Sequence, residues 1–271
     1  MPHDNRPIGV FDSGLGGLTV VRALRERLPD EGVVYLGDTA RLPYGTKSRD
    51  TILRFAREDA DFLAGHEVKA LVVACNTVSS LAMPALELAY PQLPRIGVVA
   101  AGVEALLGLE RRKRVLVLGT SATVNSDSYR RLIHRVDAGV AVTSLACPLF
   151  VPLVEEGLVT GALAESVIRH YLAPMIAAPP DALILGCTHY PLLTETIADM
   201  LPSSVQIVDS AAACAASVAR YLTENGATAE PGAAEPVERY YVTDMPASFF
   251  QLAQRFLGRP VARVDKVTVP E

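Results

Sequence analysis

Two cysteines in this chain occupy matching positions at the ends of short apolar runs. Cys75 follows the run 70–74 and begins the triplet Cys-Asn-Thr, and Cys187 follows the run 182–186 and begins Cys-Thr-His. Continuous apolar runs of this length are typical of strands buried in a parallel sheet, and ligands bind at the carboxyl ends of such strands. A thiol at each of two strand ends therefore indicates thiol chemistry at one shared site.

The residue pattern narrows the thiol chemistry. A phosphatase-type Cys-x5-Arg loop is excluded, because Leu81 stands at the arginine position. A zinc site could use Cys75, Cys187 and His189, but no Cys-x-x-Cys or His-x3-His pair is present. An amidase with one nucleophilic cysteine leaves the second thiol without a role. Inversion of an amino-acid α-carbon uses both thiols, since one removes a proton from one face and the other delivers a proton to the opposite face.

Polar groups that could shift the pKa of these two thiols also follow apolar runs. The loop 12–17, which begins at Asp12, either holds an anion with its backbone N–H groups or is a tight turn capped by Asp12. The loop 37–45 is either an ordinary polar loop or part of a ligand site. His189 either caps a turn or tunes Cys187. A cysteine that begins a helix is expected to have a lowered pKa. No residue pattern specifically indicates a Schiff-base lysine, so we expect no cofactor and no metal.

The elements that must position these residues alternate along the chain. Strand-like runs are separated by segments of helical length with apolar residues on one face, which predicts an α/β fold with doubly wound parallel sheets. The similarity of the two cysteine runs suggests two similar lobes facing a central cleft. Residues 227–238 are expected to form a surface loop, and 247–257 an amphipathic helix. The predicted strands are 7–11, 33–36, 70–74, 96–99, 114–118, 140–145, 182–185, 205–208 and 240–242.

Composition indicates which binding partners and which cellular compartment to expect. The 271 residues carry a net charge of −5 without a cluster of Lys and Arg, so no nucleic-acid partner is expected. No apolar run approaches the roughly 20 residues of a membrane helix, and no secretory leader is recognisable at the N-terminus. The four cysteines are far apart in the sequence, which favours free thiols in the cytoplasm, with Cys147 and Cys214 as structural residues.

Taken together, these motifs resemble those of the glutamate racemases in the aspartate/glutamate racemase superfamily. The Cys-Thr-His-Tyr-Pro element is the most specific of them, because aspartate racemases of the superfamily tend to carry Glu at the position of His189. The matching stretches follow the family order over nearly the whole chain and comprise residues 8–20, 37–45, 74–77, 147–155, 185–193 and 208–210.

The resemblance implies a fold and a domain division. It implies two flavodoxin-like lobes, the first formed by residues 1–98 with 209–271 and the second by residues 99–208. It also implies a homodimer in the cytoplasm that supplies D-glutamate for peptidoglycan synthesis. The alternatives are a racemase or isomerase of another acidic substrate such as aspartate, and an amino-acid-binding regulator without turnover.

The resemblance also assigns roles to individual residues. Cys75 and Cys187 are implied as the acid/base pair, with Asp12 assisting the first, His189 assisting the second and Glu155 as a further helper. The glutamate substrate is implied to contact residues in four loops: Asp12, Ser13, Pro43, Tyr44, Gly45, Asn76, Thr77, Thr188 and His189.

Overall fold

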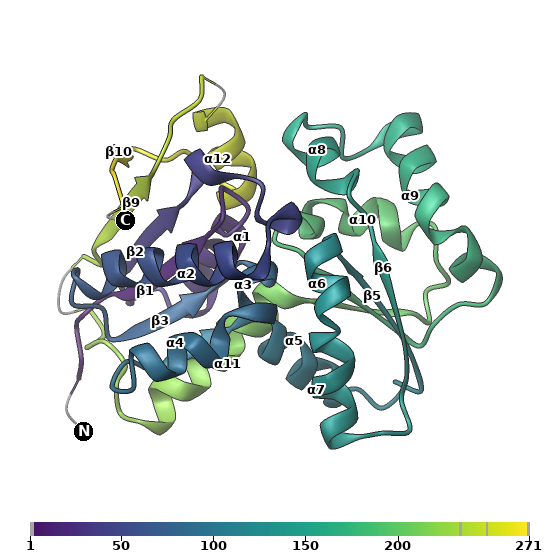
Figure 1. The fold of residues 1–271 in the computed structure, drawn as a ribbon, viewed down its shortest axis with the longest axis horizontal. Helices are drawn as coiled ribbons and strands as arrows, with labels where there is room; N and C mark the ends of the chain where they lie inside the picture. Colours follow the sequence, from purple (N-terminus) through teal and green to yellow (C-terminus); the bar gives the residue numbers. More distant parts are fainter. Residues whose placement is uncertain (1–2, 233–234, 248, 270–271) are drawn as a thin grey trace.

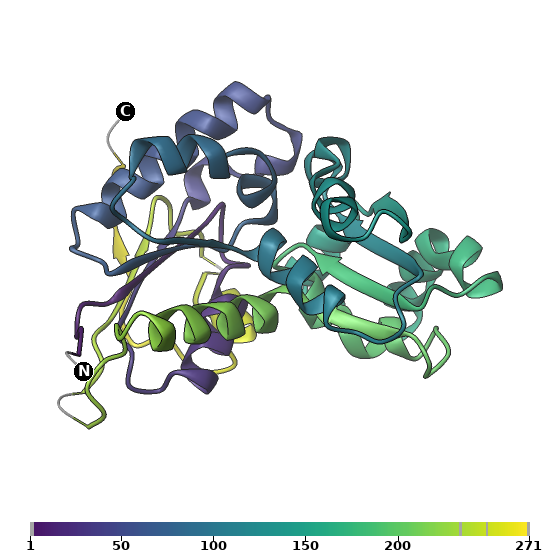
Figure 2. The ribbon, with the colours of Figure 1, turned by 90° about the horizontal axis from the view of Figure 1, so that it is seen from below.

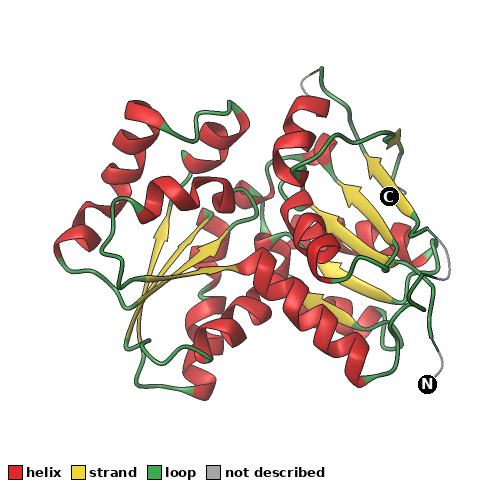
Figure 3. Cartoon of the chain, turned by 180° about the vertical axis from the view of Figure 1, so that it is seen from behind, coloured by secondary structure: helices red, strands yellow, loops and turns green. Residues whose placement is uncertain are grey.

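The computed structural model describes residues 3–232, 235–247 and 249–269, which form two α/β lobes lying side by side (Figure 1). Each lobe is built on its own sheet, and every strand pairing among the described residues is parallel. Helices lie on both faces of each sheet (Figure 3). The prediction of two doubly wound parallel-sheet lobes is confirmed.

The first lobe contains a six-stranded sheet with the order β10-β9-β2-β1-β3-β4. Its part β2-β1-β3-β4 has the strand order of flavodoxin-like sheets, in which β1 lies next to the point where the winding reverses. The six strands are β1 (Ile8–Asp12), β2 (Val33–Gly37), β3 (Ala70–Val73), β4 (Arg95–Gly97), β9 (Glu238–Val242) and β10 (Asp265–Lys266).

The second lobe contains a four-stranded sheet with the order β6-β5-β7-β8. This order repeats the flavodoxin-like order of the first lobe, with β5 in the place of β1 and β7 in the place of β3. The two cysteine-bearing strand ends are therefore equivalent positions in two similar sheets. The strands are β5 (Arg114–Gly119), β6 (Ala141–Ala146), β7 (Ala182–Gly186) and β8 (Gln206–Asp209).

Helices follow most of the strands, as the alternating pattern predicts. They are α1 (Leu18–Arg27), α2 (Arg49–Ala64), α3 (Asn76–Leu81), α4 (Met83–Ala89), α5 (Val98–Leu107), α6 (Ser121–Ser126), α7 (Ser128–Val136), α8 (Phe150–Glu155), α9 (Gly161–Ala177), α10 (Thr194–Ala198), α11 (Ser210–Glu224) and α12 (Phe249–Leu257). Three short 3-10 helices are η1 (Thr39–Arg41), η2 (Tyr44–Thr46) and η3 (Tyr190–Leu193).

The predicted strand 96–99 gives way to a helix before its expected end. The run 96–99 was predicted as strand, but β4 ends at Gly97 and α5 begins at Val98. The β-branched pair Val98 and Val99 favours a strand locally, yet both side chains are buried as residues of α5. Tertiary packing overrides local propensity here. Residues 233–234 of the predicted loop and residue 248 of the predicted amphipathic helix lie outside the described residues.

The chain returns to the first lobe after β8. From there α11 runs back and packs against α1 and α5 (Figure 2), and β9 then pairs with β2. The exact domain boundaries after residues 98 and 208 stay a prediction. No helix among the described residues has both the length and the apolar character needed to cross a membrane.

Candidate active site

The two thiols that the sequence singles out lie at equivalent strand ends, one in each lobe. Cys75 comes two residues after β3 and caps α3, and Cys187 comes directly after β7. Both are free thiols and both are nearly buried, with 5% and 6% of their surface exposed. Cys147 and Cys214 are also buried and free. In each lobe, the strand that precedes the thiol is the neighbour of the central strand, β1 or β5.

Cys75 is surrounded by the loop that follows β1. Its Sγ lies 3.5 Å from Ser13 Oγ, to which the thiol donates. Burial and the nearby charge of Asp12 raise the pKa of the Cys75 thiol to about 12. The expectation of a lowered pKa at a helix start is therefore wrong for Cys75 in the ligand-free protein, because burial outweighs the helix N-terminus.

Asp12 ends β1 and is buried beside both halves of the site. Its Oδ2 accepts a hydrogen bond from Gly14 N at 3.0 Å. Its Oδ1 is buried and has no hydrogen-bond partner among the described residues. Burial raises the pKa of the Asp12 carboxyl, while His189 and the backbone N–H groups of the loop act to lower it. Asp12 therefore offers one unpaired acceptor in a place where an unpaired group is costly.

Asn76 presents a second unpaired polar atom next to Cys75. The Tyr129 hydroxyl, from α7 in the second lobe, donates to Asn76 Oδ1 at 2.7 Å. The amide Nδ2 of Asn76 is buried and has no partner among the described residues. Because Tyr129 holds Oδ1, the Nδ2 group of Asn76 points away from Tyr129. No local pattern in the sequence points to Tyr129, because it lies on an ordinary helical face.

Threonine side chains join the two lobes on the same side of the site. Thr77 Oγ1 and Thr120 Oγ1 lie 3.1 Å apart, and Thr120 directly follows β5. A Cβ added to Gly45 would come within 3.0 Å of Thr120 Cβ, so the loop 37–45 also meets this strand end. Thr120 was not predicted as a site residue, although its place after a predicted strand was the available signal.

Three side chains lie in a row of contacts, in the order Cys187, His189 and Glu155. Its Sγ lies 4.0 Å from His189 Nδ1, and His189 Nε2 lies 3.2 Å from Glu155 Oε1 at the end of α8. Burial acts to lower the pKa of His189, but Cys187 and Glu155 together raise it to about 10. Cys187 and Glu155 therefore favour the charged form of the imidazole. Thr188 Oγ1 lies 3.4 Å from the same Nδ1 atom.

The loop 37–45 is held by a buried network of charges. The Tyr44 hydroxyl donates to Asp38 and to Asp59, the latter at 3.1 Å. Arg41 donates to Asp38 at 2.6 Å and to Asp59 at 3.0 Å, and it also pairs with Glu58. The Tyr44 hydroxyl is therefore already engaged within this network. Pro43 is exposed immediately before η2.

Gly16 brings the loop after β1 into contact with the residues that follow Cys187. Gly16, in the loop after β1, lies so near the second lobe that an added Cβ would be within 2.5 Å of His189 Nδ1 and closer still to Thr188 Oγ1. The Thr19 hydroxyl donates to Thr188 O at 3.2 Å across the same contact. The loop after β1 thus meets Thr188 and His189 of the second lobe, and Asp12 is near enough for His189 to affect its pKa, while Asn76 and Thr77 contact Tyr129 and Thr120 of that lobe.

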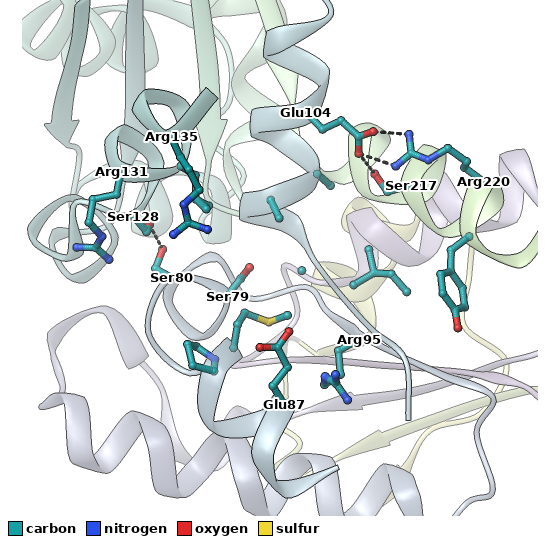
Figure 4. A pocket seen from close by; sticks show the side chains of 18 of the residues that line it. Ser79, Ser80, Glu87, Arg95, Glu104, Ser128, Arg131, Arg135, Ser217 and Arg220 are labelled. Carbon is teal, nitrogen blue, oxygen red and sulfur yellow. Dashed lines mark hydrogen bonds and ion pairs between the residues drawn. The ribbon is translucent and has the colours of Figure 1, made fainter. Parts of the chain in front are cut away.

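A cavity of about 560 Å³ lies elsewhere between the lobes. It is lined by residues of α3, α4, α5, α7 and α11, and Figure 4 shows the Ser80–Ser128 hydrogen bond and the Glu104–Arg220 ion pair in its walls. Neither Cys75 nor Cys187 lines it. The cavity is therefore separate from the thiols. Within the described ranges, no group of three or more His, Cys, Asp or Glu side chains is placed to hold a metal ion.

Known proteins with similar sequences and structures share this arrangement of lobes. Residues 14–218 match the family model described as Asp/Glu/Hydantoin racemase. A glutamate racemase of Neisseria gonorrhoeae is 45% identical over 264 residues, which cover 97% of each chain. The structure is similar to that of the Francisella tularensis glutamate racemase in complex with D-glutamate, with a TM-score of 0.91, 42% identity and 98% of each chain covered. It is also similar to a Bacillus anthracis glutamate racemase isoform, with a TM-score of 0.93, 37% identity and 99% of each chain covered. The chain therefore belongs to the Asp/Glu/Hydantoin racemase family and, within it, to the glutamate racemases.

Proposed function

We propose that this chain interconverts L- and D-glutamate without a cofactor, by proton transfer between Cys75 and Cys187. One observation carries the proposal. A buried acceptor, Asp12 Oδ1, and a buried donor, Asn76 Nδ2, lack hydrogen-bond partners among the described residues, and both residues lie beside Cys75. An amino acid supplies the complementary pair, because its ammonium donates and its carboxylates accept.

Substrate contacts follow from the polar groups at the strand ends. Asp12 is placed to accept from the substrate ammonium, and Asn76 to donate to a carboxylate. The hydroxyls of Ser13, Thr77 and Thr188 and the main chain around Gly45 offer further hydrogen bonds at the same edge of the two sheets. Glutamate as the substrate agrees with the Francisella tularensis structure, which is described as a complex with D-glutamate.

Racemisation then takes two proton transfers. One cysteine, as a thiolate, takes the proton from Cα and becomes a thiol, and the electron pair remains on the substrate as a carbanion delocalised toward the α-carboxylate. The thiol of the other cysteine gives its proton to the opposite face of Cα and becomes a thiolate. The net result is inversion with no change in the number of protons on the enzyme, and the reverse reaction exchanges the two roles.

The neighbours of each thiol are proposed to adjust its proton affinity. His189 Nδ1 lies 4.0 Å from Cys187 Sγ, and Cys187 and Glu155 raise the pKa of the imidazole, so its charged form is favoured beside this cysteine. The pKa of Cys75 is about 12 without substrate, which favours the thiol form. A bound ammonium group would partly neutralise Asp12 and make ionisation of Cys75 easier. The two thiols thus have different electrostatic surroundings, Asp12 beside Cys75 and His189 beside Cys187.

The cellular role extends this reaction. We propose that the D-glutamate product enters peptidoglycan synthesis, that the protein acts in the cytoplasm and that it forms a homodimer. Mass measurement in solution at several protein concentrations tests the last of these, and a monomeric mass at all concentrations would contradict it.

Proton exchange tests the reaction directly. Each enantiomer of glutamate and of aspartate is incubated with the enzyme in deuterated water without pyridoxal phosphate, and both Cα deuteration and optical rotation are followed. We expect deuteration and inversion of glutamate, unaffected by hydroxylamine, which removes carbonyl cofactors. Exchange confined to aspartate would favour a racemase of another acidic substrate. Binding of glutamate without exchange would favour a regulator.

Glu155→Gln is expected to shift the alkaline limb of the kcat/KM profile to lower pH by about one to three units. The Glu155 carboxylate favours the charged imidazolium, so its removal lets the pKa of His189 fall from about 10 toward its usual 6.5. The protonated imidazole then disappears at lower pH. The measurement is the pH dependence of kcat/KM together with a titration of His189 by NMR. Glu156→Gln, at the exposed next position, is the control. An unshifted alkaline limb in Glu155→Gln would contradict the proposal that Glu155 raises the pKa of a catalytically required His189.

A further inference from the structure

Helix α12 belongs to the first lobe but touches the second. It packs on α1, and the strands on either side of it in the sequence, β9 and β10, extend the first sheet. Its C-terminal turn carries Arg255 and Phe256, and both contact second-lobe residues near Cys187. In Figure 1, α12 and α8 lie on the facing sides of the two lobes.

The ring of Phe256 lies against the imidazole of His189. The two ring centroids are 4.9 Å apart, with an angle of 75° between the ring planes, so the contact is edge-to-face. Phe256 is completely buried, and His189 is only 5% exposed. A contact of this geometry restricts the plane of the imidazole as well as its position.

That plane decides what His189 can do. Its two nitrogens must face different partners at once, Cys187 Sγ at 4.0 Å and Glu155 Oε1 at 3.2 Å. The thiol contact is at the limit of a hydrogen bond to sulfur, so a small rotation of the ring would lose it. The charged or titratable groups around the imidazole are Asp12, Cys187 and Glu155, with Arg255 contacting the main chain of Glu155.

Arg255 contacts Glu155, which is the residue on the far side of His189 from Cys187. Its Nη1 donates to Glu155 O at 3.3 Å. The guanidinium lies against Gly157, which has a φ of +75°. A Cβ at position 157 would collide with it. Consecutive residues of α12 therefore hold both the helix end that carries Glu155 and the ring that Glu155 contacts.

We propose that Phe256 is a positioning residue for His189 in the racemisation reaction. Its ring holds the imidazole so that Nδ1 faces Cys187 while Nε2 stays on Glu155. Because Phe256 comes from the opposite lobe, this orientation depends on the contact between the two lobes. The inference rests on the proposed two-thiol mechanism.

Matched substitutions on one helix test the proposal. Phe256→Leu removes the ring that contacts His189, and Phe249→Leu removes a buried ring two turns earlier, whose aromatic neighbour among the described residues is Phe250. We expect Phe256→Leu to lower kcat about ten- to a hundredfold with little change in KM. Phe249→Leu should lose a similar amount of thermal stability but keep its kcat. Phe256→Met, which keeps more apolar volume, gives a second variant with the same expected loss of kcat.

Isotope effects separate positioning from general damage. If proton transfer at Cys187 slows, deuterium at Cα should show a larger isotope effect for the enantiomer that Cys187 deprotonates and a smaller one for the other enantiomer. His189→Asn provides the reference for this asymmetry, and Phe256→Leu and Phe256→Met should shift in the same direction. A lower kcat in both Phe256 variants with the isotope effects of the unmodified enzyme would overturn the positioning role. Failure of the unmodified enzyme to exchange the Cα proton would instead refute the proposed function.

Discussion

Cys75→Ala and Cys187→Ala are each expected to slow racemisation by about 10⁴-fold in both directions, the upper end of what a general acid or base contributes. Each alanine removes one of the two groups that, in the proposed mechanism, act on opposite faces of Cα. The kcat/KM values of the two directions must fall by the same factor, because the enantiomers have the same free energy in water. The rate is measured by polarimetry or circular dichroism from each pure enantiomer.

A residual reaction in the cysteine variants would identify the role of each thiol. With one thiol left, an enantiomer can lose its proton and regain deuterium on the same face, without inversion. We expect such exchange for one enantiomer in Cys75→Ala and for the other in Cys187→Ala. Cys214→Ala is the control, because Cys214 is a fully buried free thiol in the core, on α11. Full racemase activity in either catalytic variant would refute the two-thiol mechanism.

Gly16→Ala is expected to reduce kcat/KM by about a hundredfold, although it adds only one methyl group. The new Cβ would lie within 2.5 Å of His189 Nδ1 and nearer to Thr188 Oγ1, and real Cβ atoms do not approach other atoms this closely. Both neighbours are buried, so they have little room to move. Either the imidazole turns away from Cys187 or the two lobes separate, and each outcome disrupts proton transfer.

A second glycine provides the control for this substitution. Gly65 ends α2 with a φ of −64°, and the nearest atom to an added Cβ there is 3.4 Å away. Gly65→Ala should therefore keep full activity. The loss in Gly16→Ala should appear in steady-state kinetics with the thermal midpoint measured alongside. Normal kcat/KM in Gly16→Ala would show that the contact between Gly16 and His189 is not needed for turnover.

Much of the fold was predictable from the sequence because buried parallel strands leave a local pattern. Short runs of apolar residues ending in a small or polar residue marked β1, β3, β5 and β7, and the repeat of this pattern indicated two similar lobes. The exception, the run 96–99, shows the limit of the method. Val98 and Val99 have strand propensity, but their place against the rest of the core makes them helical.

The residues that we propose carry the chemistry could be picked out from the sequence, because both cysteines, Asp12 and His189 lie at or just after the ends of predicted strands. How these residues meet depends on the tertiary structure. Tyr129 orients Asn76, Gly16 contacts His189, and Phe256 packs on the same imidazole from 67 positions further along the chain. The physical reason is that these contacts join residues far apart in sequence and in different lobes. Only the packing of the lobes against each other sets such distances, and no periodicity or local propensity encodes them.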